Sequence, residues 1–298
     1  IVLPSTMQSI EYGAFYGCTS LEKITFSGEN NLQIINQHAF ENCDLQDTVD
    51  LSAACVISDY AFAGNKDLEG AVTSEALLSI GQYAFAGCKS LKDVTITAEK
   101  VKYGAYAFTD CEALTSFYVN ASVLPEGMFY ECKNLTSVKI GPDVNDIGPF
   151  AFRDTAVEAF EVDAGNKAYM VQTSHVILSA DRKTLVAVAP TLKYHFAAAD
   201  AGNEAITAIG KGAFSHNTKI PSVSLPKVTV IGEYGLASNK NLSSVELGVL
   251  TDIGEYAFFE ASITQMPAFT AETKIGKYAF SHTALTSVTI PDNMVIEE

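Results

Sequence analysis

The sequence of 298 residues contains no tryptophan, and its basic side chains are scarce. It has 19 Lys and Arg against 35 Asp and Glu, which gives a formal net charge of −16. Because a phosphate backbone is bound by clustered Lys and Arg, this balance argues against nucleic acid or an anionic membrane as the partner. No apolar run approaches the roughly 18 residues of a membrane span. The composition predicts a folded, soluble chain whose acidity serves solubility.

The chain also lacks the motifs that carry catalysis. It contains no Ser-His-Asp or Cys-His set, no paired carboxylate motif, no phosphate-cradling glycine loop and no H-E-x-x-H. Its six cysteines show no C-x2-C spacing and have no histidine in register, which argues against a metal site. We therefore predict no enzyme activity, no cofactor and no metal.

The sequence does contain one repeat that recurs along most of its length. The segment Ile80–Ile96 gives its form, and most copies contain an Ala-Phe pair. The Phe of this pair, or the residue in its place, is here called the marker, and successive markers lie 21 to 25 positions apart, except for one step of 62. A fixed period of roughly 20–29 residues is typical of a leucine-rich-repeat solenoid. The markers are Phe15, Phe40, Phe62, Phe85, Phe108, Phe129, Phe152, Phe214, Leu236, Phe258 and Phe280.

Each column of the repeat predicts a structural role. Five residues before the marker lies a large apolar side chain, which with the marker fills the interior. The next position is often Gly, as in Gly81 and Gly104, which indicates either a positive φ or very close packing of neighbouring rungs. After the marker, apolar-x-apolar pairs such as Val138 and Ile140 predict a strand with one buried face. Stacked rung upon rung, these strands predict a parallel sheet.

Two columns resemble functional sites but are explained by the repeat. Five cysteines lie three residues after the marker, where Asn or Thr stands in other copies, so we predict an interior ladder of free, buried thiols with Cys55 outside it. Tyrosines lie two residues before the marker. An aromatic stripe can bind sugar or peptide, but its phase with the core favours stacking along the outer side. The cysteines are Cys18, Cys43, Cys88, Cys111 and Cys132, and the tyrosines are Tyr60, Tyr83, Tyr106, Tyr234, Tyr256 and Tyr278.

The step of 62 predicts an insertion in the solenoid. Short strands are expected at 169–173, 175–179 and 184–189, and the polar turn at 180–183 joins the last two into a hairpin. We predict a single domain over 1–298, with repeats at 1–162, a hairpin insertion at 163–203 and repeats at 204–298. Loose sequence at 51–55 and 68–73, and Pro267 in a strand segment, predict local disturbance of the sheet.

These repeats resemble the BspA-like, or Treponema pallidum type, class of leucine-rich-repeat surface proteins. The resemblance rests on the form I-G-x-Y-A-F-x-x-C-x-x-L-x-x-V-x-I-P over eleven copies and on the pattern V-I-L-S-x-D-x-K-T-L-V at Val176–Val186. It implies a right-handed, β-rich solenoid with a parallel sheet on the concave face and short helical or turn segments opposite. It also implies a secreted or cell-surface bacterial protein that mediates adhesion, with matrix proteins such as fibronectin and fibrinogen among the partners of its members.

A binding patch is expected where the regular repeat breaks. On the exposed face of the sheet the residues are mostly small and hydroxylated, which is also what a merely solvated face would carry. Tyr118, with Lys139 and Glu161, and the hairpin turn Asp181, Arg182 and Lys183, expected to protrude, are the candidate partner-binding residues. Both ends of the sequence break off inside a repeat, so we expect a piece without its signal or anchor. The alternative function is a carbohydrate-binding or spacer solenoid within a larger surface protein.

Overall fold

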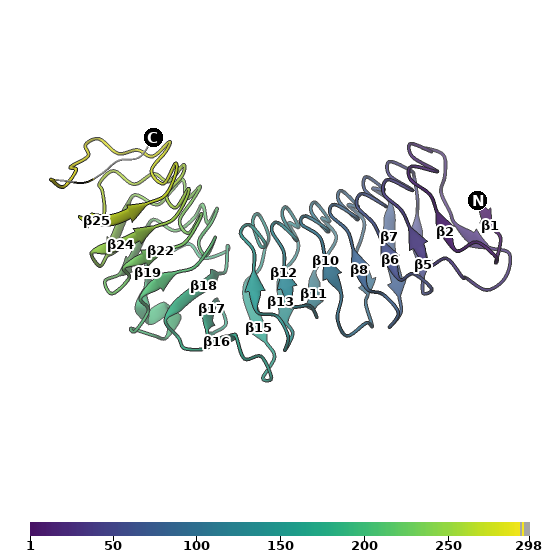
Figure 1. Cartoon of the computed structure of the whole chain (residues 1–298), viewed down its shortest axis with the longest axis horizontal. Coiled ribbons are helices and arrows are strands. Elements are labelled where there is room, and N and C mark those ends of the chain that lie inside the picture. The colour runs from purple at the N-terminus through teal and green to yellow at the C-terminus, as the bar shows by residue number, and fades with distance from the viewer. Residues whose placement is uncertain (293, 295–298) are drawn as a thin grey trace. The chain divides into compact units, whose positions relative to one another are not determined.

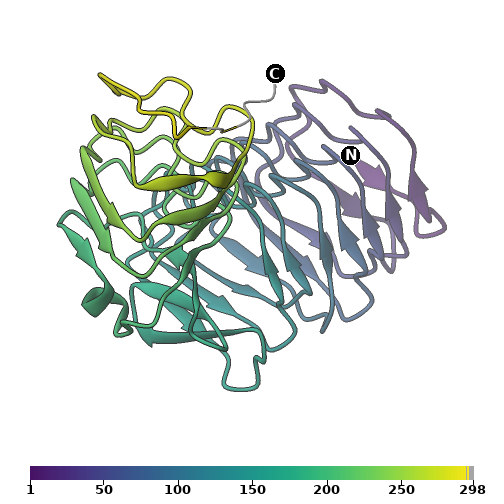
Figure 2. The same ribbon diagram turned by 60° about the vertical axis from the view of Figure 1, so that its left-hand side comes forward.

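A computed structural model describes residues 1–292 and 294 of the chain. It divides into two compact units, Ile1–Ala156 and Val157–Glu298, here called the N-terminal and C-terminal units. Both are β-solenoids in which short parallel strands repeat at the period of the sequence (Figures 1 and 2). Helix is almost absent from the described residues, which hold one 3-10 turn and many tight turns. The predicted solenoid is therefore confirmed, with turns rather than helices linking its strands.

Each rung of the N-terminal unit contributes two strands, because two segments of the repeat have buried apolar positions. One of the two strands, usually the longer, follows the turn that carries the marker, and its alternate side chains point inward. These strands are β1 (Val2–Leu3), β3 (Thr25–Phe26), β5 (Asp47–Leu51), β7 (Leu68–Thr73), β9 (Asp93–Thr95), β11 (Ser116–Val119) and β13 (Ser137–Ile140). They pair in parallel as β1-β3, β5-β7-β9 and β11-β13.

A second ladder of two-residue strands runs beside the first, and sequence reasoning missed it. Each of these strands ends at the apolar residue five positions before the marker, so the column predicted as interior filling also pairs between rungs. They are β2 (Ser9–Ile10), β4 (Ile34–Ile35), β6 (Val56–Ile57), β8 (Ser79–Ile80), β10 (Lys102–Tyr103), β12 (Val123–Leu124) and β14 (Asp146–Ile147). The first five form one parallel sheet, and β12 pairs with β14.

Marker phenylalanines fill the interior as a stack. The ring centroids of Phe62 and Phe85 lie 5.3 Å apart, and those of Phe85 and Phe108 lie 5.5 Å apart, with nearly parallel planes. All three side chains are fully buried. The small Ala before most markers leaves room for the ring, and its carbonyl also links neighbouring rungs, because the backbone N–H of Phe85 donates to the carbonyl of Ala107 at 2.9 Å.

The turn that carries the marker needs two left-handed residues in each rung. The position two before the marker has φ near +55°, and it holds tyrosine in many copies, for example Tyr83 at 54° and Tyr106 at 58°. The position two after the marker is left-handed as well, and holds Gly87 or Asp110. An aromatic side chain in this region costs roughly 1–2 kcal/mol. The tyrosine rings stack 5.0 Å apart, which offsets part of that cost.

Of the two predicted reasons for glycine at positions 81 and 104, close packing of neighbouring rungs is the one that the structure shows. Neither glycine has a positive φ, so a left-handed turn is not the reason. A Cβ on Gly81 would lie 2.4 Å from the backbone nitrogen of Asp59, and one on Gly104 would lie 2.2 Å from that of Gln82. Glycine is therefore required because the backbones of neighbouring rungs touch at this column.

The cysteine ladder is confirmed for four of its five members. Cys88, Cys111 and Cys132 are buried, and each thiol donates to the carbonyl of the marker in the preceding rung at 3.2, 3.3 and 3.0 Å. Cys43 does the same toward Phe15 at 3.0 Å. All six cysteines are free, but Cys18, in the first rung, is exposed, so its predicted burial is wrong. Asn65 replaces a thiol with an amide that bonds Phe40 O and Phe62 O, both at 2.8 Å.

Alkaline pH should therefore destabilise the ladder through these thiols. Burial raises the pKa of Cys88 from 9.0 to about 12. Below pH 9 the thiol is neutral in the folded and in the unfolded chain, so its contribution to stability is complete. Above pH 9 the thiol ionises in the unfolded chain first. The free energy of unfolding then falls by about 1.4 kcal/mol per pH unit per thiol until the pH passes the pKa of the thiol in the folded chain. We expect urea denaturation between pH 8 and pH 10.5 to show this slope.

The Cys88→Ser variant is the control for that measurement. A hydroxyl can still donate to the Phe62 carbonyl but does not ionise in this range. Its free energy of unfolding should fall less steeply with pH than that of the parent chain, by the contribution of one thiol. Equal slopes for the two proteins would contradict the assignment.

The C-terminal unit begins with β15 (Ala159–Val162) and continues through the predicted hairpin. β16 (Tyr169–Thr173), β17 (Val176–Ser179) and β18 (Thr184–Val188) form an antiparallel meander, which confirms the hairpin and its turn. β17 is buried and β18 pairs in parallel with β20 (Ala208–Ile209). The hairpin is thus built into the sheet and does not protrude, although its turn is exposed.

Residues 184–197 form a rung without an Ala-Phe pair, within the segment predicted as insertion. Leu185 lies in register with Ile209, and β19 (Phe196–Ala197) pairs with β21 (Ser222–Leu225). Asn217 donates to the carbonyl of Ala189 at 3.1 Å, as the ladder cysteines do to their marker residues. The remaining elements are η1 (Ala198–Ala201), β22 (Val230–Ile231), β23 (Ser244–Leu247), β24 (Leu250–Ile253) and β25 (Phe269–Ile275).

The irregular segments behave largely as their sequence predicts. The register between β5 and β7 shifts between Asp47 and Thr48, at the loose third repeat. Pro267 lies outside the strands, because β25 begins only at Phe269. The apolar-x-apolar pair of the last repeat, Val288 and Ile290, does not form the strand that this pattern predicts, and both residues are exposed.

Candidate binding surface

The exposed face of the longer strands is where the fold presents side chains to a partner. In β11, Phe117 and Val119 are buried while Ser116 and Tyr118 face solvent. β13 repeats the pattern, with Val138 and Ile140 buried beneath an exposed Lys139. The strand period of two therefore fixes which residues can touch another molecule.

Tyr118 and Lys139 come together on this face as the sequence predicts. They are direct partners in the parallel register of β11 and β13. The Lys139 ammonium lies 5.6 Å from the centroid of the Tyr118 ring, a cation–π distance, and the ring remains 46% exposed. A Cβ on Gly141 would come within 3.2 Å of the Tyr118 hydroxyl, so the missing side chain leaves room for the ring. The pair forms a small amphipathic platform on a rigid sheet.

The other predicted binding residues lie in the C-terminal unit. Glu161 is exposed on β15, and its grouping with Tyr118 and Lys139 stays a prediction. Asp181, Arg182 and Lys183 are all exposed in the turn between β17 and β18. The Asp181 carboxylate accepts from the Ser179 hydroxyl at 2.6 Å and from the Lys183 N–H at 3.0 Å, and the first of these bonds lowers its pKa. The carboxylate is thus engaged in holding the turn, and within the described residues neither Arg182 nor Lys183 forms an ion pair.

The tyrosine column is a continuous stack on the outside of the turns. In the N-terminal unit His38, Tyr60, Tyr83 and Tyr106 stack with centroids 5.0 Å apart. Each ring is half-buried between its neighbours, so the column presents edges rather than open faces. The stack continues the core outward and supports the structural interpretation of the column.

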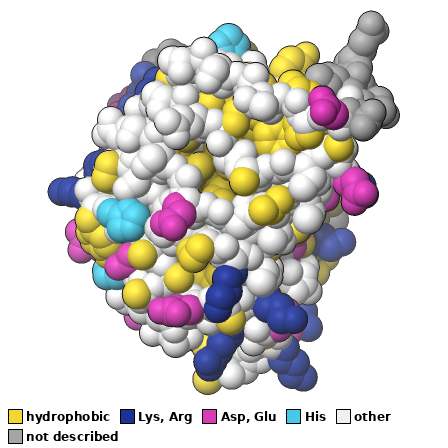
Figure 3. Space-filling view, turned by 90° about the vertical axis from the view of Figure 1, so that its left-hand side faces the viewer, with side chains coloured by type: hydrophobic (Ala, Val, Ile, Leu, Met, Phe, Trp, Pro, Cys, Tyr) yellow, Lys and Arg dark blue, Asp and Glu magenta, His cyan; other side chains and the backbone are white. Residues whose placement is uncertain are grey.

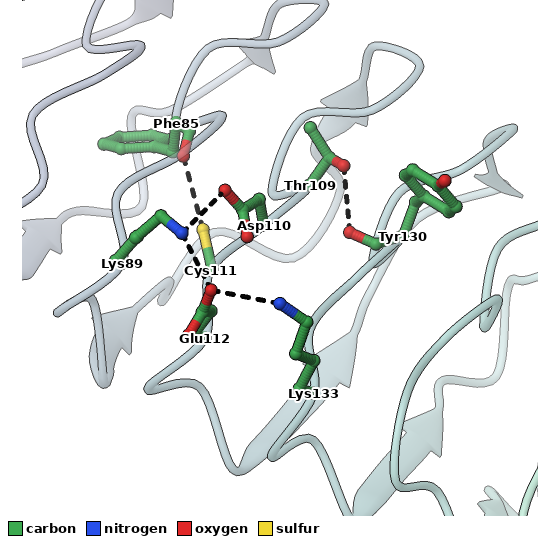
Figure 4. A network of polar contacts seen from close by, with 8 residues as sticks. All are labelled: Phe85, Lys89, Thr109, Asp110, Cys111, Glu112, Tyr130 and Lys133. Carbon is green, nitrogen blue, oxygen red and sulfur yellow. Dashed lines mark hydrogen bonds and ion pairs between the residues drawn. The ribbon is translucent and has the colours of Figure 1, made fainter.

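A polar network on the N-terminal unit shows how its charges are balanced (Figure 4). The Lys89 ammonium lies 2.8 Å from Glu112 and 3.4 Å from Asp110, and Lys133 reaches the same Glu112 oxygen at 3.2 Å. Hydrogen bonds from Lys89 and Lys133 lower the pKa of Glu112 to about 2. Lysines of this surface are therefore neutralised by acids one rung away.

Charge on the C-terminal unit is distributed differently. On the side that this unit presents in Figure 3, Lys and Arg side chains gather in one area rather than mixing evenly with Asp and Glu. Within the described residues, no group of three or more His, Cys, Asp or Glu side chains is placed to hold a metal ion. No helix among them has the length and apolar character needed to cross a membrane.

Comparison with protein families identifies the repeat. A family model described as the BspA type leucine rich repeat region matches in six copies, over residues 1–69, 55–170 and 202–298. A search of curated protein sequences finds no match.

Two solved structures share the fold over most of the chain. The pneumococcal vaccine antigen PcpA aligns with a TM-score of 0.53 at 18% identity, covering 99% of this chain. This chain spans only 62% of that protein. A leucine rich cell surface protein from Faecalibacterium prausnitzii aligns with a TM-score of 0.54 at 20% identity, covering 87% of this chain and 83% of that one. At these identities the likeness shows the solenoid fold.

Proposed function

Because the chain belongs to the BspA-type leucine-rich-repeat family, we propose that it is a non-catalytic binding module. It acts when secreted or held at the cell surface, and mediates adhesion by contacting proteins of a host or of neighbouring cells. The description of the Faecalibacterium relative as a cell surface protein supports this location. Leucine-rich repeats generally bind through surface positions that the repeat does not fix, on an extended and rigid sheet.

The observation that carries the proposal is the Tyr118–Lys139 platform. Binding hot spots favour Tyr and Arg over the Ser and Thr that dominate the rest of this face. The tyrosine is exposed yet held by its strand, so it loses little conformational freedom when a partner covers it. We propose that the ring packs against an apolar patch of the partner while Lys139 meets a carbonyl or carboxylate at its edge.

Surface-immobilised binding to fibronectin, fibrinogen, collagen and mucin tests the function. The parent chain should bind one of these saturably, and Tyr118→Ala should weaken that binding by about 10- to 30-fold, as expected for a central aromatic. Lys139→Ala should weaken it less and reduce its salt dependence.

Tyr12→Ala is the matched control for this experiment. Tyr12 is also an exposed tyrosine of the N-terminal unit, but it lies at the turns, in edge contact with His38, rather than on the strand face. Its loss should leave the affinity unchanged. If Tyr12→Ala and Tyr118→Ala weaken binding equally, or if Tyr118→Ala has no effect, the strand face is not the recognition surface.

A further inference from the structure

One surface of the C-terminal unit carries unbalanced positive charge in an otherwise acidic chain. It is formed by the segments that lead from the turn into the longer strand in three consecutive rungs, at 191–197, 217–224 and 239–245. None of these segments contains Asp or Glu. Each contains one exposed lysine, and these three, Lys193, Lys219 and Lys240, are here called the lysine row.

In the N-terminal unit most lysines of the corresponding segments pair with acids, although Lys66 has no ion pair in the described residues. There Lys92 pairs with Glu69 at 2.8 Å, and Lys89 and Lys133 share Glu112 (Figure 4). In the described residues, no acidic side chain lies within ion-pair distance of any member of the lysine row. The two units differ in total charge as well: residues 1–156 hold 20 acidic and 9 basic side chains, and 157–298 hold 15 and 10.

The pairing of the rungs brings the lysine row together. β19 pairs in parallel with β21, and β21 with β23, so the segments entering these strands lie on neighbouring rungs about 4.8 Å apart. The Ser262 hydroxyl, one rung further on, donates to the Lys240 carbonyl at 2.7 Å, which fixes the last position. The three lysines therefore lie on neighbouring rungs, three, four and five residues before the aligned strand residues Phe196, Val223 and Val245.

The side chains around the lysine row are polar or aromatic. Tyr194, next to Lys193, is 47% exposed, and the following His195 bonds the Ser222 hydroxyl at 2.7 Å. Thr218 and Asn241 stand beside the other two lysines in the chain. This combination offers ammonium groups for fixed anionic charges, hydroxyl and amide groups for hydrogen bonds, and one ring for a sugar face.

We propose that the lysine row, with Tyr194, binds a linear sulfated glycan along the direction of the solenoid. Sulfate keeps its charge at every physiological pH, and a linear chain can place successive charges against successive rungs. A compact anion can bridge lysines of nearby rungs, as Glu112 does for Lys89 and Lys133, whereas a linear chain offers one charge for each of the three. The site is separate from the strand face of the N-terminal unit, so it adds a second ligand class to the proposed protein-binding function.

Heparin, used as the sulfated probe with the full chain, tests the proposal. The parent should bind it, and the logarithm of the affinity should fall linearly with that of the salt concentration. Replacing all three lysines by Gln should weaken binding at least 10-fold at low salt and reduce the salt slope by about 3. Tyr194→Ala alone should weaken binding with little change in slope.

A charge-matched variant separates the site from general electrostatics. Lys66, Lys102 and Lys277 are exposed, have no ion pair in the described residues and belong to other segments than the lysine row. Their triple replacement by Gln should change heparin affinity less than 2-fold. Equal losses in the two triple variants, equal binding of polyglutamate, or failure of the parent to bind heparin would each overturn the proposal. Tyr118→Ala should leave heparin binding intact, so this result and that of the protein panel are independent.

Discussion

Gly104→Ala should lower the free energy of unfolding by about 3 kcal/mol, although it adds a single methyl group. The new Cβ would lie 2.2 Å from the backbone nitrogen of Gln82 and 2.5 Å from the carbonyl carbon of Gly81. Both obstacles are backbone atoms of the neighbouring rung, so no side chain can rotate away. The rungs must separate locally, which weakens the hydrogen bond from Gly104 N–H to Ile80 O at 2.8 Å.

Gly87→Ala is the control that isolates this effect in the neighbouring repeat. Gly87 has φ of +70°, so alanine there is strained, but the nearest atom to its Cβ is 3.8 Å away. We expect a loss of about 1 kcal/mol from the left-handed conformation alone. Urea denaturation of the two variants beside the parent chain measures the difference. A larger loss at Gly87 than at Gly104 would mean that backbone conformation, not rung contact, decides where the repeat needs glycine.

The repeat made the interior of this protein predictable. A period of 21 to 25 residues places equivalent side chains on top of one another, so the marker ring of Phe85 and the thiol of Cys88 could be assigned to the core from spacing alone. The same spacing correctly placed Tyr118 beside Lys139, because their offset of 21 residues is one rung. Where side chains follow the period, sequence and structure agree.

Features that do not change the apolar pattern were not predictable. The two-residue strands such as β8 are too short to show an alternation. The left-handed turn is occupied by Tyr83 rather than by Gly or Asn, because stacking on Tyr60 and Tyr106 offsets the strain. The rung at 184–197 was hidden because it lacks an Ala-Phe pair and keeps only the hydrogen bonds of the repeat.

The surface was the least predictable part, for a physical reason. Exposed positions such as Tyr118 and Lys219 carry no packing constraint, so the repeat does not determine them. The lysine row did leave a signal in the sequence, namely three consecutive entry segments without a single Asp or Glu in a chain with 35 of them. That signal has meaning only when the pairing of β19, β21 and β23 shows that the three segments are neighbours.

Phe85→Ala should destabilise the N-terminal unit by about 4 kcal/mol, in the range measured for large-to-small changes at fully buried aromatic positions. Its ring is 1% exposed and lies between Phe62 at 5.3 Å and Phe108 at 5.5 Å. Alanine would leave a gap in the stack that neither neighbour can fill, because each is fixed by its own turn. The variant would also weaken the contacts of one rung with both of its neighbours.

Phe15→Ala is the matched variant at the edge of the same stack. Phe15 is only partly buried, and its ring stacks on Phe40 alone, at 5.1 Å, within the described residues. Its replacement should cost about half as much as that of Phe85. In a solenoid each rung contacts only its neighbours, so an interior gap interrupts two interfaces and an edge gap interrupts one. Circular dichroism during urea denaturation should therefore give a much lower midpoint for Phe85→Ala than for Phe15→Ala, and equal midpoints would show that the phenylalanine stack does not couple the rungs.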